Sequence, residues 1–134
     1  MGGSGILEHM TPLHGAMRSR RFFKSFEYAF QGIKLLASER NFRIQMVFGA
    51  LAIICTFLLG LTSTDTAIII LCVALVLGGE AVNSSAERLL NFVSAEHREE
   101  IREIKDGMAA AVLIFSAAAF VIGIWIFGNA LLLR

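Results

Sequence analysis

Three long apolar runs dominate the pattern of the chain, at residues 44–61, 66–90 and 107–133. Each is close to the roughly 20 residues that a helix needs to cross about 30 Å of hydrocarbon. The first and third runs contain no charged residue, whereas the second carries carboxylates and an amide in its second half. The pattern predicts three transmembrane helices, of which the second is chemically unusual.

The segment before the first run has a different pattern, typical of an amphipathic helix over about residues 20–38. Its apolar residues recur at the spacing of one helical face, at positions 22, 23, 26, 29, 30, 33, 36 and 37. Basic residues lie mostly on the other face, so we expect this helix to rest on the membrane surface with its phenylalanines in lipid. The alternative is a soluble packed helix. Residues 1–16, "MGGSGILEHMTPLHGA", resemble an added leader, and residues 17–134 are expected to form a single domain.

Composition supports the membrane interpretation. The chain has 134 residues, 56% of them hydrophobic, and a small soluble domain could not bury so much apolar surface. A formal net charge of +1 gives no reason to expect a nucleic-acid partner. Cys55 and Cys72 lie inside apolar runs, where buried thiols are expected more often than a disulfide or a metal site.

The distribution of lysine and arginine predicts the orientation in the membrane. Seven basic residues lie between Arg18 and Arg43, the 62–65 turn has none, and four lie between Arg88 and Lys105. By the positive-inside rule the N-terminus and the second loop are cytoplasmic and the C-terminus is outside. The short turn makes the first two spans antiparallel, and the mixed charges of "SAEHREEIREIKD" predict a helical cytoplasmic connector. The fold class is therefore an all-α membrane protein.

Polar residues of the second run form one stripe. On an α-helix Asn83, Glu87 and Asn91 lie about −60°, −20° and +20° from Glu80. If the span enters from outside near Asp65, Glu80 lies roughly 22 Å along it and Glu87 roughly 33 Å. Glu80 is then within the inner leaflet, and Glu87 emerges at the cytoplasmic surface.

A carboxylate within the membrane costs at least about 2.5 kcal/mol unless it is paired or hydrated, which makes it a candidate for function. The plainer alternative is that Glu80 and Asn83 join helices through hydrogen bonds. Glu39, before the first span, and Lys105–Asp106, at the start of the third, are expected at the same cytoplasmic level. Carboxylate and amide oxygens suit Mg²⁺, lysine suits phosphate, and a buried carboxylate can act as a base toward a lipid hydroxyl. Phosphoryl transfer from a cytosolic nucleotide to a lipid fits this set.

The usual nucleotide-binding motifs are missing: the sequence contains no GxxxxGK[ST], no GxGxxG and no kinase-type catalytic loop. Gly78–Gly79 is better explained as a close contact between helices. Instead, "GEAVNSSAERLLN", "ERNFRIQ" and "IKDGMAAAVL" resemble, in order, signatures of the bacterial integral-membrane diacylglycerol kinase/undecaprenol kinase family. The resemblance extends over about residues 20–130.

This resemblance implies a homotrimer in the bacterial inner membrane. Each protomer would have three spans and an N-terminal surface helix, with active sites shared between neighbouring protomers. The enzyme would use ATP with Mg²⁺ on the cytoplasmic side and phosphorylate a lipid alcohol.

The resemblance also implies roles for single residues. Glu80 would be the catalytic base, Lys105 would neutralise the transferring phosphates, and Glu39 and Glu87 would hold Mg²⁺. The nucleotide-binding set would be Arg21, Tyr28, Glu39, Asn83, Glu87, Lys105 and Asp106. Asn91 stands where the family usually has an aspartate, so its part in nucleotide binding is open.

Two lipid substrates are compatible with these motifs. "ERNFRIQ" and the preceding "RFFKSF" are more similar to the undecaprenol kinase branch, which favours undecaprenol, with diacylglycerol as the alternative. Both lipids offer a primary hydroxyl at the interface. A non-enzymatic helical membrane subunit, with the polar stripe used for assembly, is the remaining alternative.

Overall fold

The computed structural model describes residues 12–93 and 98–132, and for residues 12–23 it describes the backbone alone. Every element in these ranges is an α-helix: α1 (Pro12–Leu36), α2 (Arg40–Leu58), α3 (Ser63–Val93) and α4 (Glu99–Leu132). They form two compact units, Met1–Leu35 and Leu36–Arg134. Most of the expected leader, residues 1–11, lies outside the described residues.

The first unit is built on α1, which begins at Pro12, eight residues before the expected start of the surface helix. Proline is well tolerated in the first turn of a helix because its missing N–H would have no partner there. The side chains of Phe26, Phe30 and Ile33 are exposed in this unit, as the amphipathic interpretation requires of residues that contact lipid. Whether α1 lies on a membrane remains a prediction.

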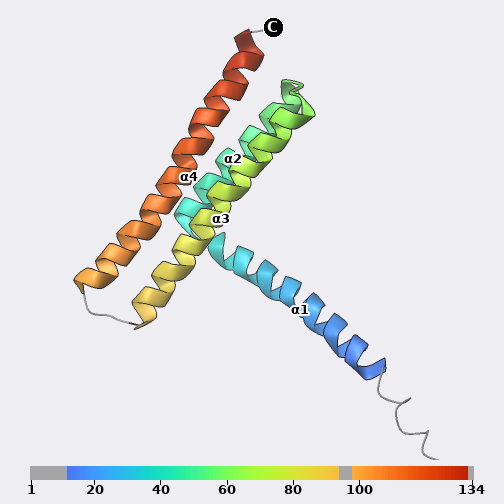
Figure 1. The fold of residues 1–134 in the computed structure, drawn as a ribbon, viewed down its shortest axis with the longest axis vertical. Coiled ribbons are helices and arrows are strands. Elements are labelled where there is room, and N and C mark those ends of the chain that lie inside the picture. Colours follow the sequence, from blue (N-terminus) through green and yellow to red (C-terminus); the bar gives the residue numbers. More distant parts are fainter. Residues whose placement is uncertain (1–11, 94–97, 133–134) are drawn as a thin grey trace, which may run out of the picture. The chain divides into compact units, whose positions relative to one another are not determined.

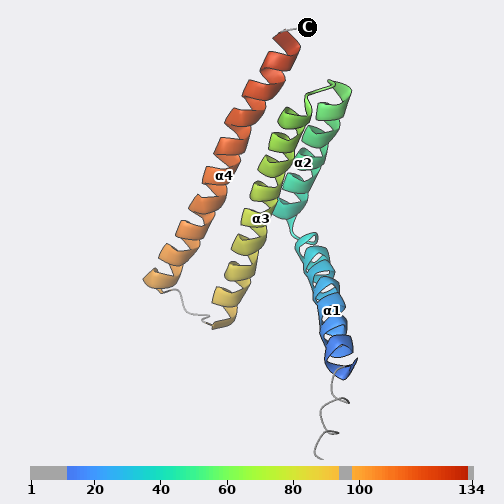
Figure 2. The same ribbon diagram turned by 45° about the vertical axis from the view of Figure 1, so that its right-hand side comes forward.

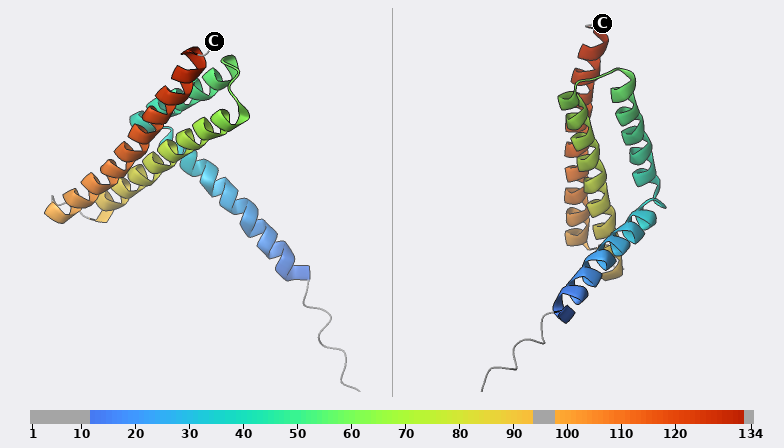
Figure 3. Two further views of the ribbon diagram at one scale, coloured as in Figure 1. Left: turned by 45° about the horizontal axis from the view of Figure 1, so that its top comes forward. Right: turned by 90° about the vertical axis from the view of Figure 1, so that its right-hand side faces the viewer.

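The second unit consists of α2, α3 and α4, in which α3 runs antiparallel to both α2 and α4 (Figures 1 and 2). α3 packs against α2 along one side and against α4 along another, as the two views of Figure 3 also show. The first turn of α2, the last turns of α3 and the first turns of α4 therefore point toward the same end of this unit. α2 has 19 residues, α3 has 31 and α4 has 34, so α2 is roughly 28 Å long and α3 roughly 46 Å.

The connection between α2 and α3 depends on Gly60, whose φ of 59° lies in the left-handed region that favours glycine. The backbone N–H of Gly60 donates to Phe57 O, and that of Leu61 donates to Thr56 O. These bonds close the helix at Leu58, so the first span ends before residue 61, where the apolar run had placed it. The apolar sequence continues through the turn, whereas the regular helical pattern of backbone hydrogen bonds ends there.

α4 begins at Glu99 rather than at residue 107, because the predicted helical connector is continuous with the third span. Two carboxylates occupy its first turn, Glu99 and Glu100, where they interact favourably with the positive end of the helix dipole. Arg102 pairs with Glu99 at 2.8 Å on the exposed surface. The helical character of the connector is thus confirmed from residue 99 onward, its cytoplasmic location stays a prediction, and residues 94–97 lie outside the described part of the chain.

Close packing between the spans depends on two glycines. A Cβ atom on Gly49 of α2 would lie 2.7 Å from Cγ1 of Val73 on α3, and one on Gly79 of α3 would lie 2.8 Å from Cδ2 of Phe115 on α4. The predicted glycine contact is therefore made by Gly79, while a Cβ on Gly78 would meet nothing within 4 Å. Missing side chains let helix backbones approach closely, which is a main source of packing energy in membranes.

The surface of the three-helix unit is largely apolar. Phe48, Phe57 and Trp125 are among its large exposed side chains, and α2, α3 and α4 are each long and apolar enough to cross a membrane. The chain is a multi-pass membrane protein. Cys72 is buried as expected, but Cys55 is exposed; both thiols are free.

Candidate active site

The polar stripe of α3 is buried in its first half, at Glu80 and Asn83, and exposed in its second half, at Glu87 and Asn91. Glu80, Asn83 and Ser84 are buried between the helices, and Glu80 is only 4% exposed. Glu87, one turn further along, is exposed near the end of the helix. Glu39, just before α2, contacts Arg88 of α3, which places it at the same end of this unit as Glu87.

Glu80 has a partner that the sequence reasoning missed. Gln45 of α2 donates a hydrogen bond from Nε2 to Glu80 Oε2 at 3.4 Å, while its own Oε1 is buried and has no partner. An amide inside an apolar run could have indicated this contact, since polar residues in transmembrane helices usually face other helices. Which residue it would contact depends on the rotation of α2 against α3.

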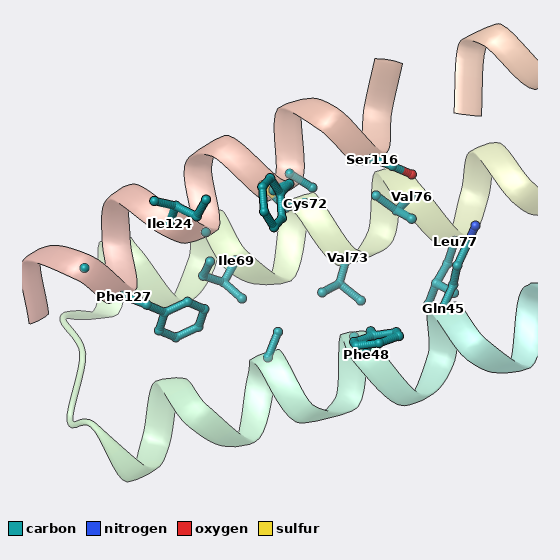
Figure 4. A pocket seen from close by; sticks show the side chains of 16 residues that line it. Gln45, Phe48, Ile69, Cys72, Val73, Val76, Leu77, Ser116, Ile124 and Phe127 are labelled. Carbon is teal, nitrogen blue, oxygen red and sulfur yellow. The ribbon is translucent and has the colours of Figure 1, made fainter. Parts of the chain in front are cut away.

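Gln45 also lines a cavity of about 650 Å³ between α2, α3 and α4. Figure 4 shows its lining, which is almost entirely apolar. Phe48 of α2, Ile69 and Val73 of α3, and Ile124 and Phe127 of α4 line it. Ser116 and the amide of Gln45 are its polar side chains. The cavity therefore offers an apolar volume whose polar end is hydrogen-bonded to Glu80.

Asn83 and Glu87 provide oxygen atoms suited to a magnesium ion. Asn83 Nδ2 donates to Glu87 Oε1 at 3.4 Å, and Asn83 Oδ1 is buried without a hydrogen-bond partner. Among the residues that the structure describes, no three His, Cys, Asp or Glu side chains form a group that could hold a metal. Mg²⁺ is commonly held by one or two carboxylates together with substrate phosphates, and the residues present fit an ion that arrives with a nucleotide.

Glu39 occupies the N-cap position of α2 without a side-chain capping bond, and its carboxylate forms an ion pair with Arg88 of α3. Arg88 donates from Nε at 2.9 Å and from Nη2 at 2.6 Å to the same oxygen, Glu39 Oε1. A hydrogen bond with the Ser84 hydroxyl, and then the Arg88 guanidinium, hold the pKa of Glu39 below its usual value. Arg88 had entered the sequence analysis only as a basic residue of the second loop; nothing local in the sequence links it to a residue 49 positions away.

Lys105 of α4 donates a hydrogen bond from Nζ to Asn91 Oδ1 of α3 at 2.7 Å. The residue that departs from the family pattern is therefore a direct neighbour of the predicted phosphate-binding lysine. Asp106, the next residue on α4, is exposed.

The two predicted site residues of α1 belong to the other compact unit. Tyr28 is exposed on it, and Arg21 lies on its helical backbone. Their approach to a nucleotide remains a prediction.

A buried carboxylate, an apolar cavity and basic side chains at one end of a multi-pass helical protein suit the class of membrane-embedded enzymes that act on lipids. Comparison with known proteins identifies the family. The family model for prokaryotic diacylglycerol kinase matches residues 27–127. The chain belongs to this family of lipid kinases, and this membership implies that its substrates are a lipid and ATP.

Three curated relatives support this membership. The chain is 32% identical over 108 residues to an undecaprenol kinase of Bacillus subtilis, covering 80% of this chain and 88% of that one. It is 34% identical over 101 residues to a diacylglycerol kinase of Synechocystis, covering 74% of this chain and 58% of the relative. A diacylglycerol kinase of Haemophilus influenzae is 32% identical over 91 residues, which cover 67% and 77% of the two chains.

Proposed function

We propose that this lipid kinase transfers the γ-phosphoryl group of ATP to undecaprenol at the cytoplasmic face of the bacterial inner membrane. The observation that carries the proposal is the position of Glu80, which is buried and hydrogen-bonded to the polar end of an apolar cavity. A long-chain alcohol has matching parts, since its chain suits the cavity and its hydroxyl suits the carboxylate.

In the proposed reaction Glu80 accepts the proton of the lipid hydroxyl while the hydroxyl oxygen attacks the γ-phosphorus. A new oxygen–phosphorus bond forms, the bond to the β-phosphate oxygen breaks, and ADP leaves with the electron pair of that bond. Glu80 afterwards returns its proton to water. Lys105 lies at the end of α4 where the phosphates would be, and its ammonium stabilises the charge that develops on them.

Glu39 and Glu87 would hold Mg²⁺ with support from Asn83, and the ion would supply positive charge against the phosphates. Asp106 and, from α1, Arg21 and Tyr28 would contact the nucleotide. We further propose that the protein is a homotrimer with sites shared between protomers, and that its N-terminus is cytoplasmic. These assignments rest on the motif resemblance and, for orientation, on the distribution of basic residues.

For the lipid substrate, two candidates have support. The undecaprenol kinase of B. subtilis matches over most of both chains, which favours undecaprenol. Two relatives are named diacylglycerol kinases at similar identity, so diacylglycerol is the second candidate.

The test is a phosphate-transfer assay with the purified protein in one detergent, offering undecaprenol and diacylglycerol in parallel at equal mole fraction. We expect a higher kcat/KM for undecaprenol, measured by transfer of radioactive phosphate from ATP to extractable lipid. A higher kcat/KM for diacylglycerol would assign the second candidate. Phosphorylation of neither lipid, in a sample whose nucleotide binding is intact, would contradict both.

A further inference from the structure

The guanidinium of Arg88 lies where it can bind either Glu39 or the phosphates of a nucleotide. Arg88 follows Glu87 in the chain, and its side chain is 43% exposed although two of its N–H groups are bound to Glu39. Glu39 is 27% exposed, so the pair lies at the surface of the candidate site and is open to a ligand. A guanidinium that spends both bonds on one carboxylate oxygen can redirect the same planar edge to two phosphate oxygens.

Occupation of Glu39 by a divalent cation would disfavour this ion pair. A doubly charged ion and a guanidinium that share one carboxylate repel each other, and solvent at this exposed pair weakens the repulsion without removing it. The cation would arrive with a polyphosphate, which offers Arg88 oxygen acceptors of higher negative charge. The partner lost and the partner gained would thus lie in the same site.

We propose that Arg88 is a further phosphate-binding residue, which pairs with Glu39 in this structure and exchanges that carboxylate for phosphate oxygens of the nucleotide when a divalent cation occupies Glu39. This inference rests on the proposed assignment of Glu39 to the metal. It gives the site two basic residues for the phosphates, Lys105 from α4 and Arg88 from α3.

The exchange predicts effects of opposite sign on two ligands, which a purely structural ion pair would not produce. In the full-length protein, Arg88→Gln should bind Mn²⁺ alone about two- to fivefold more tightly, because Glu39 no longer has a competing partner. The same variant should bind a non-hydrolysable ATP analogue with Mg²⁺ about 10- to 100-fold more weakly, because charge-assisted bonds to phosphate are lost. Electron paramagnetic resonance of Mn²⁺ and equilibrium dialysis of the labelled analogue measure these affinities without turnover.

Glu39→Gln supplies the complementary measurement. Without divalent metal, the analogue should bind this variant more tightly than wild type, because Arg88 is already released. Adding Arg88→Gln to Glu39→Gln should abolish that gain, as expected for two residues that share one interaction.

Arg102→Gln is the matched control. It removes the same charge from an ion pair of similar length, with Glu99 on the exposed surface of α4, and neither residue is assigned to the site. Both affinities should stay within twofold of wild type.

Three results would overturn the inference. Nucleotide affinity within twofold of wild type in Arg88→Gln would leave Arg88 a structural partner of Glu39. A parallel loss of Mn²⁺ and nucleotide affinity would make it a residue that orients Glu39 for the metal. If Arg88→Gln does not assemble, Arg88→Lys keeps the charge but loses the planar pair of donors, and unchanged nucleotide affinity in that variant would also contradict the exchange. A wild-type protein that binds nucleotide but phosphorylates no lipid would instead contradict the proposed function.

Discussion

Glu80 is buried in a transmembrane helix beside a neutral partner, Gln45. An arginine partner would hold the carboxylate in its ionised form, whereas an amide can donate to a carboxylate and, after rotation, accept from a carboxylic acid. This chemistry suits a residue that must gain and lose a proton in each turnover. A residue that served only helix association could equally well be glutamine, whereas a base needs the carboxylate.

Glu80→Gln should therefore fold and bind nucleotide but lose most of its turnover. The amide keeps the size and hydrogen bonding of the side chain but cannot accept the hydroxyl proton, and the loss of a general base typically lowers kcat about 10²- to 10⁴-fold. The measurement is kcat beside nucleotide affinity for the same preparation. Turnover near the wild-type value would return Glu80 to a structural role.

The Glu39–Arg88 pair should make stability depend on pH in acid. Because the Ser84 hydroxyl and the Arg88 guanidinium lower the pKa of Glu39 in the folded protein, its carboxylate stabilises the fold fully above the unfolded pKa, near 4.5. That contribution is lost as the pH falls through the lower, folded pKa.

In metal-free buffer the unfolding midpoint of wild type should exceed that of Glu39→Gln at pH 7, and the difference should shrink at lower pH. A difference that stays constant from pH 7 to pH 3 would exclude Glu39 as its source.

At the scale of the element, the spacing of the stripe on α3 was predictable because one helix fixes the angles between its own residues. The contacts that complete the site were not. Gln45–Glu80 and Arg88–Glu39 join residues 35 and 49 positions apart, and they depend on how α2 is rotated against α3. The end of the first span was also misplaced, because backbone hydrogen bonds at Gly60 and Leu61, rather than hydropathy, decide where α2 ends.

Adjacent glycines on α3 allow a controlled test of helix packing. Gly79→Ala should destabilise the protein, since its Cβ would meet the Phe115 ring at 2.8 Å and overpacking typically costs about 1–3 kcal/mol. Gly78→Ala meets nothing within 4 Å and should be neutral or up to about 1 kcal/mol stabilising through helix propensity. Unfolding of both variants in the same detergent micelles measures the difference, and equal stabilities would argue against close α3–α4 packing.

α1 should behave as an interfacial helix. Spin labels placed singly along residues 20–37 are expected to show lipid accessibility with a period of about 3.6 residues, highest near Phe26 and Phe30, because one face carries the apolar side chains. Accessibility to oxygen and to a polar relaxing agent provides the measurement. Uniform exposure to water at every position would favour the alternative of a soluble helix.

For the molecule as a whole, three spans that alternate in direction place the two ends of the second unit on opposite sides of the membrane. The basic residues before α2 and between α3 and α4 predict which side is which. The sequence sufficed for this level of description, because the length and charge asymmetry of each span are local properties. The relation between the two compact units, by contrast, is not determined by any local pattern.

A reporter that is active only outside the cytoplasm should be active when it is fused to the C-terminus. A reporter that is active only inside the cytoplasm should be active when it is fused before α1. The paired fusions control for expression, since each reports where the other is silent. Cytoplasmic activity of the C-terminal fusion would contradict the N-in, C-out topology.

The short length of α2 has a consequence for the surrounding bilayer. At roughly 28 Å it nearly equals the hydrocarbon thickness of a typical membrane, while α3 and α4 are much longer. Hydrophobic matching is therefore governed by α2, and a thicker bilayer would draw Glu39, at its start, toward the acyl chains or tilt the helix. The depth at which the Glu39 carboxylate meets water therefore depends on the thickness of the bilayer that surrounds the enzyme.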